Sequence, residues 1–171
     1  GYAVAGFMDN DDRSVDAAVV AAESAEVTIV RWDNGHNIES QICADLESPG
    51  LTKFVELGVE RRAAESTVLD DLTSVDSANP VSSLDVQTWI DAGTTLDQAR
   101  DRIARAADKR KWFKEVDDGR ALGAWIMQHQ RQPALAEVMN RLNDIYAFVY
   151  PQTVPVEAEG ADAQGDTSAN G

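Results

Sequence analysis

Three aspartates follow an apolar segment near the start of the sequence. Residues 2–8 are typical of a buried strand, and Asp9, Asp11 and Asp12 come directly after it. Alternate residues of an extended segment point the same way, so Asp9 and Asp11 can share one divalent cation. Carboxylate oxygens on a fixed backbone are the ligands that Mg²⁺ and Mn²⁺ prefer. The alternative is a helix cap, in which Asp11 or Asp12 caps a helix that begins near Ser14 and the other acids are solvated.

A second polar segment should lie beside the first. Residues 26–32 are rich in β-branched side chains and predict a strand, and a helix over 14–25 separates it from the first strand. This order predicts a right-handed crossover between parallel strands. The carboxyl ends of parallel strands share one edge of a sheet, where ligands commonly bind. We therefore expect Glu39, shortly after the second strand, to complete an acidic cluster with Asp9 and Asp11.

A basic segment lies farther along the chain. Residues 100–114 contain seven lysines and arginines but only two aspartates. Such a patch can contact a polyanion, although an ordinary solvated helix explains the same charges and is the favoured interpretation. Trp112 and Phe113 should be anchored in a core and thereby fix the direction of Lys114. A lysine beside metal-bound carboxylates could stabilise charge that develops during phosphoryl transfer; the alternative is a surface lysine.

Other motifs fit less well. Arg13 stands where a haloacid-dehalogenase-type phosphatase has Thr or Val, and Arg13 and Ser14 break the pattern of an EF-hand calcium loop. His36 could approach a metal or phosphate but is interpreted as an exposed loop residue. His129 is expected near a helix end, where it favours the helix dipole. Cys43 is interpreted as a small core residue rather than a nucleophile.

The remaining sequence predicts helices. They are expected over 37–46 and 51–72, separated by a break at 48–50, and then from Thr95, over 120–130 and from Pro133. The apolar stripe of the last helix, including Tyr146 and Val149, is expected to be core. The inward positions expected over 51–72 are Phe54, Val55, Val59, Ala63 and Leu69. Three regions follow: an α/β domain over 1–80, a helical domain over 81–150 and a disordered acidic tail over 151–171.

The composition limits the class of protein. A net charge of −15 over 171 residues argues, taken alone, against a nucleic-acid partner. The charge is uneven, however, because residues 1–80 carry 16 acids and 5 bases whereas residues 81–150 carry 10 of each. No apolar run is long enough to span a membrane, and the N-terminus lacks a signal-peptide pattern. Cys43 is the only cysteine, so no internal disulfide can form and a cytoplasmic location is expected.

Three ordered segments resemble the C-terminal nuclease region of the OLD (overcoming lysogenization defect) family of ATP-dependent endonucleases, whose catalytic module is a TOPRIM domain. The first strand with Asp9-Asn10-Asp11 is similar to the TOPRIM D-x-D motif. The second strand with Asn37-Ile38-Glu39 resembles the S/N-x-E element of that family. The segment from Lys111-Trp112-Phe113-Lys114 to Gly123 is similar to the one that holds the family's lysine. The resemblance covers roughly residues 2–130.

The resemblance implies a TOPRIM-like parallel sheet flanked by helices, followed by an all-α helical subdomain. It also implies an enzyme that cleaves DNA phosphodiester bonds with two Mg²⁺ or Mn²⁺ ions. Asp9 and Asp11 would hold metal, and Glu39 would hold metal or orient the attacking water. Asn37 would support the site, and Lys114 would stabilise the transition state. The implied partners are DNA, an N-terminal ATPase domain of the same polypeptide that binds ATP, and a second copy in a homodimer, with no membrane.

Two family features are missing from this sequence. It contains no G-x-x-x-x-G-K-[ST] phosphate-binding loop, and only Gly1 precedes Tyr2 where TOPRIM nucleases have an upstream strand with a further glutamate. We therefore expect partner strands upstream in a longer polypeptide.

Three alternatives to the nuclease remain. The first is a non-catalytic regulatory or oligomerisation domain. The second is another TOPRIM protein, a primase or a topoisomerase, although Tyr146 and Tyr150 resemble core and rim residues rather than nucleophiles. The third, a receiver-like phosphoacceptor domain, is disfavoured because residues 40–80 offer no further strand.

Overall fold

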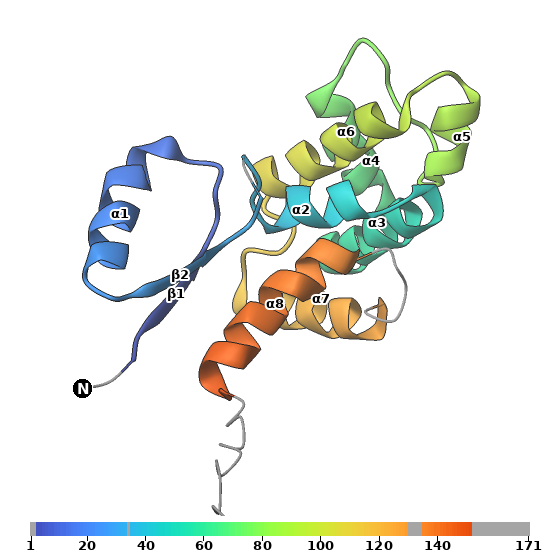
Figure 1. The fold of residues 1–171 in the computed structure, drawn as a ribbon. Coiled ribbons are helices and arrows are strands. Elements are labelled where there is room, and N and C mark those ends of the chain that lie inside the picture. Colours follow the sequence, from blue (N-terminus) through green and yellow to red (C-terminus); the bar gives the residue numbers. More distant parts are fainter. Residues whose placement is uncertain (1–2, 34, 130–134, 152–171) are drawn as a thin grey trace, which may run out of the picture.

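The computed structural model describes residues 3–33, 35–129 and 135–151 as a small parallel sheet with a crossover helix, joined to a larger group of helices (Figure 1). The elements are β1 (Ala5–Met8), the short 3₁₀ helix η1 (Arg13–Val15), α1 (Asp16–Ser24), β2 (Thr28–Arg31), α2 (Ile38–Asp45), α3 (Ser48–Arg62), α4 (Glu65–Val75), α5 (Val86–Asp91), α6 (Leu96–Lys109), α7 (Val116–His129) and α8 (Ala136–Val149). An α/β beginning followed by helices is thus confirmed. The predicted tail lies outside the described residues after Pro151.

The strand–helix–strand unit forms as predicted. β1 and β2 pair in parallel, with Ala5 opposite Thr28 and Met8 opposite Arg31. Both strands are shorter than the sequence predicts, because regular pairing is limited to these four positions. Asp12 caps η1, since its carboxylate accepts a hydrogen bond of 2.8 Å from the backbone N–H of Ser14. The cap interpretation is therefore right for Asp12.

The helices from residue 48 onward differ from the prediction in three places. The segment 48–50 does not interrupt the helices but opens α3, where Pro49 lies in the first turn and its missing N–H is harmless. The expected helix over 51–72 is divided, because Ala63 adopts a left-handed conformation with φ 63° and ends α3. Ala63 is consequently exposed rather than inward. Gly119 lies within α7 rather than before it.

One core joins the helices from α2 to α8. Its largest fully buried side chains include Phe54, Leu72, Ile103, Trp112 and Leu135. These residues come from both sides of residue 80, where the sequence predicts a domain boundary. Thr95 begins α6 as expected, with a capping box that it shares with Gln98.

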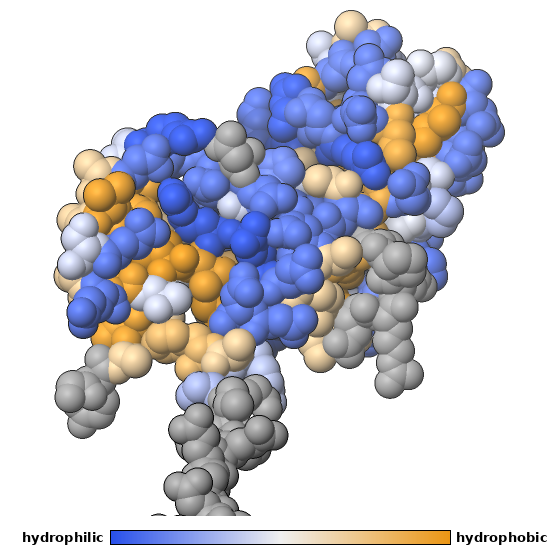
Figure 2. Space-filling view, in the orientation of Figure 1, coloured by the Kyte–Doolittle hydropathy of each residue, from blue (hydrophilic) through white to orange (hydrophobic). Residues whose placement is uncertain are grey.

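The apolar side chains of the sheet unit are buried less completely. Val4, Phe7 and Val20 are exposed, and Figure 2 shows hydrophobic surface gathered over the region of β1, β2 and α1. The end of α8 is also exposed: Tyr146 and Val149 are 59% and 56% accessible. The expectation that these two residues belong to the core was wrong, because the C-terminal half of α8 extends past the helices that bury its first turn (Figure 1).

Asp45 fastens α8 to the end of α2. Its Oδ2 accepts hydrogen bonds from the backbone N–H groups of Glu137 at 3.0 Å and Val138 at 3.1 Å. The first N–H groups of a helix have no partner inside it, so this carboxylate acts as a cap supplied from elsewhere in the chain. Burial raises the pKa of Asp45, and these hydrogen bonds oppose that shift.

An Asp45→Ala variant is expected to lose about 1–2 kcal/mol of unfolding free energy, the upper range for loss of a helix cap. Urea denaturation measures it. Asp91→Ala is the matched control, because Asp91 is exposed and its carboxylate accepts a hydrogen bond from the side chain of Gln87 rather than from a helix backbone. Equal losses in the two variants would show that Asp45 does not cap α8.

Candidate active site

Hydrogen bonds join the segments that follow β1 and β2. The backbone N–H of Asn10 donates to the carbonyl of His36 at 2.8 Å, and that of Gly35 donates to the carbonyl of Asn10 at 3.0 Å. The Asn10 side chain adds a bond of 3.1 Å to the carbonyl of Trp32. The prediction that the two polar segments lie side by side at one edge of the sheet is therefore confirmed.

Asn37 begins α2 and faces the first aspartate segment. Its side-chain oxygen accepts a hydrogen bond of 3.0 Å from the backbone N–H of Ser40, whose hydroxyl in turn accepts from the N–H of Asn37. The Nδ2 of Asn37 lies 3.5 Å from Oδ2 of Asp11. The same amide thus fixes the start of α2 and contacts a predicted metal ligand.

Glu39 is a buried carboxylate in the first turn of α2. Its side chain is 1% exposed, and its Oε1 lies 3.3 Å from Nζ of Lys114. Its Oε2 is buried and has no hydrogen-bond partner among the described residues. Burial raises the pKa of Glu39, and its own backbone N–H and Lys114 offset this shift only in part. A buried oxygen without a partner is unfavourable, so a further cation would be stabilised there.

Lys114 links this carboxylate to the end of α6. Its Nζ lies 3.4 Å from Oδ1 of Asp108 in addition to the contact with Glu39. Burial lowers the pKa of Lys114, but pairing with the two carboxylates outweighs burial and the pKa is raised. Trp112 and Phe113, just before it, are buried in the core. The prediction that these aromatic residues anchor the lysine segment is confirmed.

Asp9, the remaining predicted metal ligand, is influenced electrostatically by the other residues of the site. Burial and the charge of Asp11 raise the pKa of Asp9, whereas Lys114, the backbone N–H of Ile38 and the Trp32 side chain lower it. Asp9 therefore interacts with residues of all three predicted segments. Within residues 3–33, 35–129 and 135–151, however, no three His, Cys, Asp or Glu side chains are placed to hold one metal ion together. Lys114 balances the charge of Glu39 in this arrangement.

Sequence reasoning missed the role of Asp108, which it counted only as an opposing charge in the basic segment. No local pattern indicates that a residue of α6 contacts the lysine six positions later, because the turn after α6 brings them together. His36 is half-buried rather than exposed, with Nδ1 3.0 Å from Oε1 of Gln41. Cys43 is buried, and burial raises the pKa of its thiol, so the prediction of a core residue is confirmed.

Most charges of the basic segment are paired with acids of the same chain. The pairs are Arg100 with Asp97 and Glu47, Arg102 with Asp76, Arg105 with Asp101, and Arg110 with Asp71. Arg105 fits the favoured interpretation of a solvated helix, since it and its partner are both exposed. Arg102 does not, because it is buried and lies 2.6 Å from Asp76.

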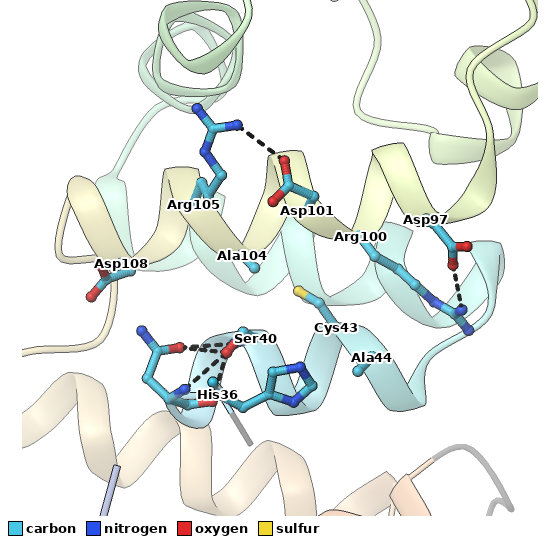
Figure 3. Close-up of a pocket in the computed structure, with 12 residues that line it drawn as sticks. His36, Ser40, Cys43, Ala44, Asp97, Arg100, Asp101, Ala104, Arg105 and Asp108 are labelled. Carbon is cyan, nitrogen blue, oxygen red and sulfur yellow. Dashed lines mark hydrogen bonds and ion pairs between the residues drawn. The ribbon is translucent and has the colours of Figure 1, made fainter. Parts of the chain in front are cut away.

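A cavity of about 450 Å³ opens beside the site, between α2 and α6 (Figure 3). Its lining includes Asn37 and Asp108, so it adjoins the carboxylates described above. In Figure 3, Cys43 and Ala104 point into the space between the two helices, whereas the pair of Arg105 and Asp101 points away from α2. The cavity lining therefore combines small side chains with charged ones, which include Arg100 and Asp108.

The charge of Glu39 makes stability depend on pH. Its pKa in the folded protein is raised above the usual 4.5, so protonation favours folding. This stabilisation is present below pH 4.5 and is lost as pH rises through the folded-state pKa.

We expect the unfolding free energy of the wild type to fall, relative to Glu39→Gln, as pH increases above 4.5. Urea denaturation between about pH 4 and 8 measures the difference, and parallel profiles would contradict it. The contributions of Asp9 and Asp45 cancel in the comparison.

No family model, curated protein or solved structure matches this chain. Among the described residues, none of the helices combines the length and the hydrophobicity of a transmembrane segment. The site is therefore interpreted from the chemistry of its own residues.

Proposed function

We propose that this protein is a divalent-metal-dependent DNA nuclease, the nuclease portion of an OLD-like protein built on a TOPRIM-like sheet. The observation that carries the proposal is a group of side chains beyond the carboxyl ends of β1 and β2: Asp9, Asp11, Asn37, Glu39 and Lys114. One buried oxygen of Glu39 in this group has no hydrogen-bond partner within the part of the chain that the structure describes. Carboxylates clustered beside a lysine suit hydrolysis of a phosphodiester, whose reaction develops negative charge.

The donor set fits Mg²⁺ or Mn²⁺. Asp9, Asp11 and Glu39 supply hard oxygen ligands. Oε2 of Glu39, which no described residue contacts by a hydrogen bond, would gain a cation. A bound ion would polarise a phosphoryl oxygen and lower the pKa of bound water. Joint binding by the three carboxylates requires their side chains to approach and Lys114 to leave Glu39, because they are not grouped for one ion as they stand.

The other residues would position the reaction. Asn37 contacts Asp11 and would hold that carboxylate in orientation while its own rotamer is fixed by the cap of α2. Lys114 is partly exposed and would present its ammonium to the charge that develops on the phosphate. The start of α2 fixes the position of Asn37, and the buried rings of Trp112 and Phe113 fix the backbone of Lys114.

Plasmid nicking tests the proposal. The complete chain is incubated with supercoiled DNA and Mn²⁺ or Mg²⁺, and calorimetry measures metal binding in parallel. We expect the wild type to bind metal and nick DNA, and Asp9→Asn/Asp11→Asn to lose both activities. Asp117→Asn is the control, since Asp117 is exposed on α7 and pairs with Arg120. Equal nicking by wild type and the double variant would refute the proposal. Absence of metal binding and cleavage in the wild type would favour the non-catalytic domain.

A further inference from the structure

We propose that Lys114 serves as the cation partner of Glu39 until a metal ion binds, and that Asp108 then retains the lysine as a positioning residue. This inference rests on the proposed metal site and adds to it the exchange of one cation for another. The structural basis is a single ammonium group between two carboxylates, 3.3 Å from Glu39 and 3.4 Å from Asp108.

The two carboxylates differ in how much they need a cation. The Glu39 side chain is 1% exposed, whereas that of Asp108 is 48% exposed and therefore accessible to solvent. An ionised carboxylate that is buried without a partner is strongly unfavourable, and an exposed one is not. When Glu39 is ionised it therefore requires a cation, and Lys114 supplies it in the metal-free protein.

Lys114 pairs with one of the two carboxylate oxygens of Glu39. Its ammonium contacts Oε1, while Oε2 is buried and has no hydrogen-bond partner within the described residues. A divalent ion carries twice the charge of the ammonium and is the stronger partner for a buried carboxylate. Two cations on one carboxylate repel each other, so metal binding at Oε2 and the Lys114 contact at Oε1 are competing events.

Asp108 gives the displaced lysine a second partner. The ammonium already lies within ion-pair distance of Asp108, so it can leave Glu39 and remain paired with a carboxylate. The flexible four-carbon stem of lysine permits this movement. The backbone need not follow, because Trp112 is fully buried and Phe113 is nearly so. After the exchange, Lys114 remains beside the site and is free to contact phosphate.

Mn²⁺ titrations of four forms of the complete chain test the exchange: wild type, Lys114→Met, Asp108→Asn and the double variant. We expect Lys114→Met to bind Mn²⁺ about three- to fivefold more tightly, the size of effect that a partly exposed ion pair produces. We expect Asp108→Asn to bind Mn²⁺ about two- to threefold more weakly, because Glu39 is then the one carboxylate of the described residues that still forms an ion pair with Lys114. In the Lys114→Met background, Asp108→Asn should leave the Mn²⁺ affinity unchanged.

Two controls separate this mechanism from general charge effects and from misfolding. Asp101→Asn removes a comparably exposed acid of the same helix that pairs with Arg105, and it should leave the affinity unchanged. Thermal denaturation should show a lower midpoint for Lys114→Met without metal and a larger rise when Mn²⁺ is added. That larger rise reports tighter binding from the folded state and requires no activity measurement.

Three results of these titrations would overturn the exchange or a part of it. Equal or weaker Mn²⁺ binding by Lys114→Met overturns the exchange while leaving the proposed nuclease intact. An equal effect of Asp108→Asn with and without the lysine means that Asp108 acts through its own charge, which overturns its positioning role. Failure of the wild type and all variants to bind Mn²⁺ removes the proposed metal site and this inference with it.

Discussion

A Trp112→Ala variant is expected to lose about 3–5 kcal/mol of unfolding free energy, the range for truncating a fully buried tryptophan. Trp112 is completely buried, and its ring packs against Gly58 of α3. Its indole N–H donates a hydrogen bond of 3.0 Å to Oδ2 of Asp71, which is also buried. The substitution therefore opens a cavity in the core and removes a hydrogen bond inside it.

Two comparison variants identify the cause. Trp112→Phe keeps most of the ring volume but leaves Asp71 without the indole donor, so an intermediate loss of about 1–3 kcal/mol is expected. Tyr146→Ala removes an aromatic ring that is 59% exposed and should change stability by about 0.5 kcal/mol or less. Urea denaturation measures all three. A loss for Trp112→Ala similar to that for Tyr146→Ala would show that this core is not closely packed.

Trp112 also connects stability to the candidate active site. It lies two residues before Lys114, and Phe113 between them packs against Phe54 with ring centroids 5.3 Å apart. These anchors fix where the backbone of Lys114 emerges beside Glu39. Damage to the core at Trp112 should consequently weaken the placement of the lysine as well as the fold.

The sequence predicted the relation between the two acidic segments because that relation depends on few physical rules. A helix between two apolar strands implies a parallel crossover, and parallel strands end at one edge. Asn10 and His36 are hydrogen-bonded across this edge as a result. Prediction of the lysine anchor succeeded for a similar reason, since adjacent Trp and Phe side chains are seldom both left in water.

Other features depend on contacts that no local pattern encodes. The left-handed Ala63 divides a continuous helical pattern into α3 and α4, although alanine itself favours helix. Tyr146 and Val149 occupy apolar positions of a regular stripe, and only the length of α8 beyond its neighbours leaves them exposed. The bridge from Lys114 to Asp108 forms because the chain turns after α6. Such outcomes arise from tertiary packing rather than from spacing.

The paired arginines bear on how the proposed nuclease would attract DNA. Charge counting along the sequence indicated a basic patch, but Arg100, Arg102 and Arg110 are held by carboxylates of other segments. Their charges stabilise the contacts of α6 and the turn after it. A nuclease built on this chain would therefore attract phosphate chiefly through bound metal and Lys114, which explains how a chain with a net charge of −15 could act on DNA.

Gly58→Ala is expected to destabilise the protein by about 2–3 kcal/mol, the upper range for overpacking a core. A Cβ at position 58 would lie 2.6 Å from Cε3 of Trp112, a ring that is fully buried and cannot move aside. The cost outweighs the roughly 1 kcal/mol that alanine normally contributes over glycine inside a helix. This glycine is therefore required by the close approach of α3 to Trp112.

Gly123→Ala is the matched control for this claim. Gly123 lies inside α7, and a Cβ there would meet nothing within 4 Å, so we expect a gain of about 0.5–1 kcal/mol. The two Gly→Ala changes should thus have opposite signs in the same denaturation experiment. In a double-mutant cycle, Trp112→Phe should relieve much of the Gly58→Ala loss, because the clash involves atoms of the six-membered ring of the indole. Additive losses would show that position 58 and the indole do not interact, and that the rigid support proposed for Lys114 has another origin.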